Sequence, residues 1–228
     1  MKPIISAEQK GKTCPPRRIP LSEKMTASTL QNAYDEIAEG YDKKIWFDQH
    51  ILGVKRLRRN LLSKATGRIL EVACGTGLNI PLFPAGSDIT AVDLSPNMLE
   101  VGRANGTKHG LNVNFAVMDA EHLEFADGSF DTVVSTLSTC TFPDPVKALQ
   151  EMKRVCRPNG LILLLEHGHS SLPWLANFQD RNEYQHYRDH AGCRWNQDPL
   201  DLVKSAGLKV LRSKRNILGM FHSVEAAP

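Results

Sequence analysis

Three acidic residues follow apolar segments that have the character of buried strands, and their types and positions could support ligand chemistry. Glu71 lies near the end of the first segment, Asp93 ends the second, and Asp119 follows the third. Open α/β sheets bind ligands along the edge where the carboxyl ends of their strands meet. We therefore expect three carboxylates at one edge, facing a ligand that carries an amine or another cation, hydroxyl groups, or both.

A glycine-rich turn follows the first of these segments. Residues 73–77 read Ala-Cys-Gly-Thr-Gly, and residues 78–82 begin a helical pattern. Gly75 and Gly77 permit positive φ and a close approach of backbone to a ligand, and a helix start offers free N–H groups. Ile80 stands where the dinucleotide fingerprint Gly-x-Gly-x-x-Gly needs its third glycine, which argues against a nicotinamide-dependent oxidoreductase.

Asp93, the acid that ends the second segment, stands where a ribose-binding residue is expected. Asp93 comes about 20 residues after the glycine turn, where a strand-end acid of a βαβ unit accepts hydrogen bonds from ribose hydroxyls. Ser95 and Pro96 then predict the cap and the first position of a helix. Met98, in the first turn of that helix, either lies against an adenine ring or packs in the core.

These motifs resemble those of the class I S-adenosylmethionine-dependent methyltransferases. The family's first motif, Glu/Asp-x-Gly-x-Gly-x-Gly, matches at Glu71, Gly75 and Gly77, with Ala73 replacing the first glycine and disfavouring positive φ there. Residues 33–42 resemble the Tyr-Asp-x-x-Ala-x-x-Tyr-Asp motif of a subgroup. That subgroup contains ubiquinone and menaquinone C-methyltransferases, phospholipid N-methyltransferases and related small-molecule enzymes.

The resemblance implies S-adenosylmethionine as cofactor and S-adenosylhomocysteine as product. It implies that Tyr41 closes over the methionine end, that Asp119 accepts from the adenine amino group, and that the backbone N–H of Ala120 donates to the ring. The expected cofactor-binding residues are Tyr41, Glu71, Ala73, Gly75, Gly77, Asp93, Leu94, Met98, Asp119, Ala120 and Ser135.

An acceptor that must lose a proton requires a base, and histidines follow the fifth apolar segment. His167 is the candidate general base, because imidazole titrates near neutral pH; an ordinary polar loop residue is the alternative. His169 lies two positions further on, with Tyr184, His186 and Tyr187 behind it.

The cysteines do not predict covalent catalysis or metal binding. No base or orienting group can be assigned to Cys140, so a covalent role is not expected. His186, His190 and Cys193 have metal-like spacing, but a polar surface helix explains them better, and no metal site is predicted.

The resemblance covers residues 30–225 and implies a Rossmann-like α/β fold. The expected sheet has seven strands in the order 3-2-1-4-5-7-6, with strand 7 antiparallel, helices on both faces and an N-terminal helical cap. The predicted strands cover 69–72, 88–93, 112–117, 132–135, 161–165, 208–211 and 220–224.

Three segments surround this sheet in a single methyltransferase domain over 26–228. Residues 1–25 are basic and proline-rich and are interpreted as a flexible tail, with an organelle-directing leader as the lesser alternative. Residues 26–62 form the helical cap, and 170–196, polar and aromatic, are interpreted as a substrate lid.

Within the helical cap, Ser28 is the expected N-cap of a helix that continues through Tyr41. The interspersed arginines Arg56, Arg58 and Arg59 are interpreted as solvated.

Composition and the absence of certain motifs exclude some classes of protein. The net charge of +3 is too small to indicate nucleic-acid binding, and no apolar run approaches the length of a membrane span. Five widely spaced cysteines indicate reduced thiols and a cytoplasmic protein, or an organelle matrix protein if the tail is a leader. Residues 136–142 also lack the Asp/Asn-Pro-Pro-Tyr motif of enzymes that methylate DNA amino groups.

The sequence thus predicts methyl transfer to a small, fairly apolar molecule or a lipid-type acceptor. Peripheral membrane contact and a monomer or homodimer are compatible with this prediction. The alternatives are a protein or RNA methyltransferase, supported only by the basic tail, and a cofactor-binding subunit without turnover.

Overall fold

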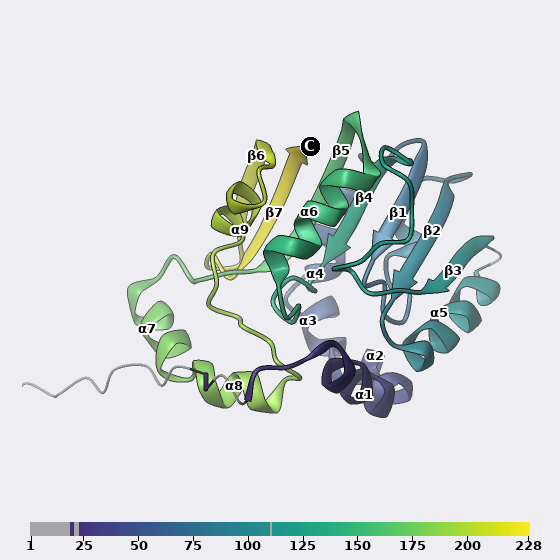
Figure 1. Ribbon diagram of the computed structural model, residues 1–228. Coiled ribbons are helices and arrows are strands. Elements are labelled where there is room, and N and C mark those ends of the chain that lie inside the picture. Colours follow the sequence, from purple (N-terminus) through teal and green to yellow (C-terminus); the bar gives the residue numbers. More distant parts are fainter. Residues whose placement is uncertain (1–18, 21–22, 110) are drawn as a thin grey trace, which may run out of the picture.

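A seven-stranded sheet forms the centre of the computed structural model, which describes residues 19–20, 23–109 and 111–228. The order is β3-β2-β1-β4-β5-β7-β6, and β7 runs antiparallel to both of its neighbours, which confirms the predicted topology (Figure 1). The strands are β1 (Arg68–Val72), β2 (Asp88–Asp93), β3 (Val113–Val117), β4 (Phe130–Thr136), β5 (Cys156–His167), β6 (Lys209–Asn216) and β7 (Phe221–Ala227).

The parallel register brings the carboxyl ends of the central strands to one edge. Val72, the last residue of β1, pairs with Val92 of β2 and with Ser135 of β4. The turn after β1, the loop after β2 and the loop after β4 therefore leave the sheet side by side. This is the edge at which the sequence predicts a ligand.

Successive side chains of β1 point to opposite faces of the sheet, so the core has one part on each face. Leu70 and Val72 pack in one cluster with α6 (Pro145–Val155) and α9 (Pro199–Ser205), whereas Ile69 packs on the opposite face with α4 (Val54–Leu62). All three strand residues are fully buried, as expected for a parallel strand covered on both sides. Helices on both faces are thus confirmed (Figure 1).

Side-chain caps begin several of the helices, among them the helix that the sequence predicts after Ser95. The Ser95 hydroxyl accepts from the N–H of Met98 at 3.0 Å and begins α5 (Pro96–Lys108). Asp144 accepts from the N–H of Lys147 at 3.0 Å and begins α6. Each cap satisfies an N–H that has no partner within its helix, worth about 1 kcal/mol.

The N-terminal helical cap is more broken than expected. Its helices are α1 (Ala27–Ile37), α2 (Tyr41–Lys44), α3 (Trp46–His50) and α4, with a 3₁₀ turn η2 (Ala38–Gly40) before α2. Thr26, not Ser28, caps α1, because Thr26 and Thr29 exchange hydrogen bonds in a capping box. The single helix predicted through Tyr41 is therefore wrong.

Several further boundaries differ from the sequence prediction, among them the end of β6, which extends to Asn216 beyond the predicted 208–211. Residues 78–82 form turns and a short 3₁₀ helix, η3 (Ile80–Leu82), instead of beginning an α-helix, so the glycine-rich turn is not followed directly by an α-helix N-terminus. Strand β5 begins at Cys156, ahead of the predicted 161–165, and its pairing with β4 is irregular between Phe130 and Thr132.

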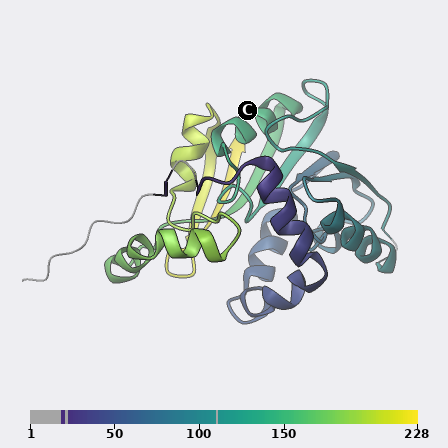
Figure 2. The ribbon, with the colours of Figure 1, turned by 60° about the horizontal axis from the view of Figure 1, so that its bottom comes forward.

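Residues 170–196 contain two helices, α7 (Pro173–Arg181) and α8 (Glu183–Asp189), and α8 lies near α1 (Figure 2). The backbone N–H of Met25 donates to the Tyr187 hydroxyl at 2.7 Å, and the Tyr184 hydroxyl donates to Glu23 at 2.6 Å. The described end of the predicted tail thus packs against the predicted lid; residues 1–18 and 21–22 lie outside the described residues.

Among the helices within 19–20, 23–109 and 111–228, none combines the length and the apolar character that crossing a bilayer requires.

Candidate functional site

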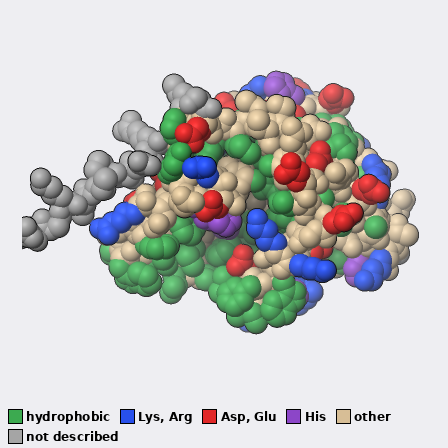
Figure 3. All heavy atoms as spheres, turned by 90° about the horizontal axis from the view of Figure 1, so that it is seen from below, with side chains coloured by type: hydrophobic (Ala, Val, Ile, Leu, Met, Phe, Trp, Pro, Cys, Tyr) green, Lys and Arg blue, Asp and Glu red, His purple; other side chains and the backbone are tan. Residues whose placement is uncertain are grey.

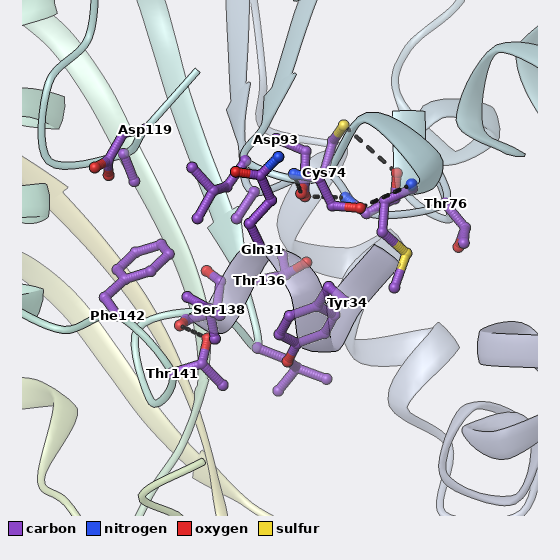
Figure 4. Close-up of a pocket in the computed structure, with 18 of the residues that line it drawn as sticks. Gln31, Tyr34, Cys74, Thr76, Asp93, Asp119, Thr136, Ser138, Thr141 and Phe142 are labelled. Atoms are coloured by element: carbon purple, nitrogen blue, oxygen red, sulfur yellow. Dashed lines mark hydrogen bonds between the residues drawn. The ribbon is translucent and has the colours of Figure 1, made fainter. Parts of the chain in front are cut away.

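A cavity of about 880 Å³ opens between the carboxyl edge of the sheet and the N-terminal helices (Figure 4). Its walls come from the turn after β1, the ends of β2 and β3, the loop after β4, and helices α1, α2 and α4. Eight of the predicted cofactor-binding residues line it: Tyr41, Ala73, Gly75, Asp93, Leu94, Met98, Asp119 and Ala120.

Three predicted residues do not line this cavity. Glu71 is buried behind it, where the Asn79 amide donates to its carboxylate at 2.8 Å. A Cβ on Gly77 would lie 2.7 Å from Ile80, so this glycine serves close packing. Ser135 is fully buried and hydrogen-bonds to Ser138. Of the three acids expected at this edge, Asp93 and Asp119 therefore line the cavity and Glu71 does not.

Asp93 joins two loops of the cavity wall. Its carboxylate accepts from the backbone N–H of Gly75 at 2.8 Å and from that of Ser95 at 2.9 Å. Burial raises the pKa of Asp93, and these backbone hydrogen bonds oppose that shift. Each oxygen retains a lone pair that can accept from a ligand hydroxyl.

The turn after β1 leaves room for a ligand along its backbone. A Cβ on Gly75, which has φ of 54°, would meet no atom within 4 Å and would project into open space. Ala73 also has φ of 54°, although the sequence predicted that alanine would disfavour this conformation. A non-glycine residue held there stores about 1–3 kcal/mol, and such residues concentrate at functional sites.

Asp119 and Phe142 lie beside each other at one end of the cavity (Figure 4). One Asp119 oxygen accepts from the backbone N–H of Glu121 at 2.9 Å, and the side chain remains 31% exposed. The ring of Phe142 adds an apolar surface to this end of the cavity. Met98 is 1% exposed and packs in the core, and it also borders the cavity; its contact with an adenine ring stays a prediction.

Arg58 is the main residue that sequence reasoning misplaced. It is 6% exposed and lines the cavity, so its interpretation as solvated is wrong. It donates to the side-chain amide oxygen Oδ1 of Asn79 at 2.8 Å and to the Thr136 hydroxyl. Burial lowers its pKa, but a guanidinium stays protonated in proteins. The signal was its spacing from Val54 and Leu61, which places all three on one face of α4.

The hydrogen-bonded group that contains Arg58, Asn79 and Thr136 also includes a buried carboxyl, that of Glu71. Asn79 connects Arg58 to Glu71, whose second oxygen has no hydrogen-bond partner among the described residues. Burial raises the pKa of Glu71 to about 7, opposed by the Asn79 hydrogen bond and the Arg58 charge. The cation of Arg58 thus lies in the cavity wall, and the amide of Asn79 and the titratable acid of Glu71 lie behind it.

A second cavity, of about 1170 Å³, adjoins the first. Tyr34, Tyr41, Leu137 and Thr141 line both cavities and form the boundary between them. The two tyrosine rings lie 6.2 Å apart at an angle of 60°. Burial raises the pKa of Tyr41 to about 12, so its hydroxyl keeps its proton at neutral pH.

His167 lines the second cavity, and of the predicted cofactor residues Tyr41 alone also borders it. Its Nδ1 lies 3.6 Å from the sulfurs of both Cys140 and Cys193. The expectation that no base could be assigned to Cys140 is therefore wrong. His186 stacks between Trp195 and His190 at 4.0 Å from each ring.

The other side chains considered as bases are engaged elsewhere. His169 lies 3.1 Å from Asp180, and Tyr184 and Tyr187 bind the segment that precedes α1.

Comparisons with known proteins agree with this architecture. Residues 70–164 match the family model described as a methyltransferase domain. The chain is 32% identical over 86% of its length to the mitochondrial methyltransferase OMS1 of Saccharomyces cerevisiae, of which the match covers 45%. It is 35% identical over 63% of its length to a demethylmenaquinone methyltransferase of Staphylococcus haemolyticus, again covering 63% of that protein. The chain thus spans about half to two thirds of these relatives.

The fold has solved counterparts. A SAM-dependent methyltransferase from Thermotoga maritima superposes with a TM-score of 0.67 at 19% identity, covering 87% of this chain and 99% of the other. The chain therefore matches the methyltransferase domain over residues 70–164 and has the fold of S-adenosylmethionine-dependent methyltransferases, and both findings support S-adenosylmethionine as its cofactor.

Proposed function

We propose that this protein transfers the methyl group of S-adenosylmethionine to a small, fairly apolar molecule or a lipid-type acceptor. The observation that carries this proposal is the pair of adjoining cavities that share Tyr34, Tyr41, Leu137 and Thr141. One cavity contains the predicted cofactor residues and the other is open for an acceptor. Orientation of donor and acceptor at such a boundary can supply about 7–11 kcal/mol of the barrier reduction.

The polar groups of the first cavity complement the cofactor from one end to the other. Asp119 and the N–H of Ala120 suit the adenine edge, and Asp93 suits the ribose hydroxyls. Arg58 supplies a fixed cation for the amino-acid carboxylate, a role that the three acids could not perform. The cofactor itself supplies an electrophilic methyl group on a sulfonium.

The walls of the second cavity favour an apolar acceptor. Most of its surface is apolar or aromatic, with side chains from α1, from the segment between α2 and α4, from β7 and from the predicted lid. Members of this apolar lining are Ile37, Ile45, Leu52, Leu137, Trp195, Met220 and Phe221. The demethylmenaquinone methyltransferase relative is named for an apolar quinone precursor, which supports an acceptor of similar character.

Two exposed apolar surfaces support peripheral contact with lipid. Around α3, Trp46, Phe47 and Ile51 are between 53% and 60% exposed; on α7, Trp174 and Phe178 are 66% and 51% exposed. Figure 3 shows hydrophobic side chains gathered in two places on this face, with a hollow between them. Interfacial aromatic residues of this kind bind headgroup regions, from which an apolar acceptor could enter.

The proposal is tested by incubating the protein with cofactor labelled in its methyl group. The acceptor panel should include quinone precursors, phospholipids with amine headgroups, small amines, phenols and thiols, and separate samples of protein and RNA. We expect label in the organic extract. Label only in protein or RNA would contradict the proposal, and cofactor binding without label anywhere would favour a binding subunit.

A matched pair of variants separates the two cavities. Ile45→Trp fills the second cavity without touching the first, so methyl transfer should fall at least about tenfold while affinity for S-adenosylhomocysteine stays the same. Lys55→Trp, on the exposed side of α4, is the control and should change neither quantity.

The domain assignment remains part of the proposal. We propose one methyltransferase domain over 26–228, with 170–196 as the substrate lid and His167 as a candidate base for acceptors that lose a proton. The yeast relative's name places that protein in mitochondria, which supports the organelle alternative to the cytoplasmic location.

A further inference from the structure

Two cysteines and a histidine that are far apart in the sequence meet at the wall of the second cavity. Cys140 lies in the loop after β4, His167 ends β5, and Cys193 follows α8. The two sulfurs are 3.4 Å apart, and each lies 3.6 Å from Nδ1 of His167. Both cysteines are almost fully buried, at 1% and 6% exposure.

These three distances match one face of a tetrahedral zinc site. With Zn–S of about 2.3 Å and Zn–N of about 2.0–2.1 Å, tetrahedral angles give S···S separations of about 3.8 Å and S···N separations of about 3.6 Å. The observed triangle has edges of 3.4, 3.6 and 3.6 Å. By contrast, a disulfide needs its sulfurs about 2.05 Å apart.

Hydrogen bonding between these two thiols is too weak to explain why their side chains lie together. Thiols are weak hydrogen-bond donors and acceptors, so the contact between the Cys140 and Cys193 sulfurs contributes little stability by itself. A divalent cation reverses this situation because it deprotonates a coordinating thiol. Two thiolates and one neutral imidazole would balance the charge of one zinc ion at a buried site.

The surrounding structure holds the three side chains in place. The buried carboxylate of Glu166 accepts from the N–H groups of Ser138 and Thr139 at 3.1 Å each, which fixes the loop that carries Cys140. The N–H of Arg194 donates to the carbonyl of Cys140 at 2.9 Å, which ties the segment of Cys193 to that loop. Such supporting contacts orient ligands for a metal.

We propose that Cys140 Sγ, Cys193 Sγ and His167 Nδ1 bind one zinc ion, with the fourth coordination position open toward the second cavity. All three residues line that cavity, and three protein ligands with one open position are the arrangement of catalytic zinc sites. Thiolate and imidazole ligands favour zinc over magnesium or calcium. The open position takes water or a polar atom of a molecule in the cavity.

The proposal replaces the weak cluster noted in the sequence. His186 and His190 stack on each other, so Cys193 belongs with two residues that the tertiary structure brings to it. It also gives His167 a role that differs from a free general base. Zinc binding does not depend on methyl transfer, so its failure and that of the proposed function can be told apart.

The test begins with the unaltered chain, prepared under reducing conditions and dialysed extensively. Elemental analysis should find about one zinc per chain, and X-ray absorption should show two sulfurs at about 2.3 Å and nitrogen at about 2.0 Å. Cobalt added to the metal-free chain should produce thiolate-to-metal charge-transfer and tetrahedral ligand-field bands. Absence of both zinc and cobalt uptake would overturn the proposal, as would a Cys140–Cys193 disulfide in this preparation.

Variants identify the ligands. Cys140→Ala and Cys193→Ala should lower zinc content at least about tenfold, and His167→Gln should weaken retention against a chelator. Cys156→Ala removes a buried thiol outside the cluster and is the matched control, which should keep its zinc. Equal zinc in all three cysteine variants would overturn the proposal, and the cobalt spectrum of the unaltered chain gives a result even if a variant fails to fold.

Discussion

The carboxylate of Asp93 accepts a hydrogen bond from the backbone N–H of Gly75 at 2.8 Å, which joins the end of β2 to the turn after β1. Its other oxygen accepts from the N–H of Ser95 at 2.9 Å. One acid thereby sets the separation of two loops that border the cofactor cavity. Its removal should therefore disturb both the fold at this edge and the ligand that binds there.

Asp93→Ala is expected to weaken binding of S-adenosylhomocysteine by about 10- to 100-fold, because hydrogen bonds to a charged group contribute about 1.5–3 kcal/mol. Titration calorimetry measures the affinity, and a melt of the ligand-free protein should show a lower midpoint. Asp88→Ala, at the exposed start of the same strand, is the control and should change neither. Unchanged affinity in Asp93→Ala would refute the ribose assignment.

Arg58→Lys should lower affinity for S-adenosylhomocysteine by about tenfold, because lysine lacks the planar fork that pairs with a carboxylate. Affinity for 5′-methylthioadenosine, which lacks the amino-acid portion, should stay the same. The comparison of the two ligands separates loss of the carboxylate contact from general damage to the cavity. Arg59→Lys, one residue further along α4 and exposed, is the matched control. Equal weakening of both ligands would count against this role of Arg58.

Ala73→Gly should stabilise the protein by about 1 kcal/mol, because glycine adopts the φ of 54° found there without strain. In a chain of this size the melting midpoint should rise by about 2–4 °C. Ala91→Gly, in the middle of β2 and fully buried, should instead lower the midpoint. A lower midpoint for Ala73→Gly would show that the turn is not strained at this residue.

The ligand-free protein should lose stability as the pH rises from about 4.5 to about 7. Burial raises the pKa of Glu71 to about 7, above its usual 4.5, so the folded state holds this proton where the unfolded chain releases it. The contribution of this group is complete below pH 4.5 and is lost by pH 7, a change of about 3 kcal/mol. Urea unfolding at several pH values measures it.

Glu71→Gln provides the check on this pH dependence. Glutamine keeps an oxygen that can accept from Asn79 but cannot ionise, so the fall in stability between pH 4.5 and 7 should become shallower. Glu124→Gln, at an exposed position, should leave the slope as it is. An unchanged slope in Glu71→Gln would assign the pH dependence to other groups.

Local patterns in the sequence were sufficient for the elements and their order. Apolar segments ending at Val72 and Asp93, with capping residues such as Ser95, predict strands and helix starts because burial and hydrogen bonding act on neighbouring residues. The resemblance to a known family then supplied the strand order 3-2-1-4-5-7-6, which local patterns do not contain. Most of the cofactor cavity followed, since its residues stand at strand ends.

Tertiary structure alone decided which side chains meet. Arg58 is part of the cavity wall because α4 packs its buried face against the sheet. Glu71 lies behind that wall, where the Asn79 amide donates to its carboxylate. Cys140, His167 and Cys193 come together only when β5 and the segment after α8 close around one cavity. A chain's local periodicity says whether a residue is buried, whereas its partners depend on contacts between elements that are distant in sequence.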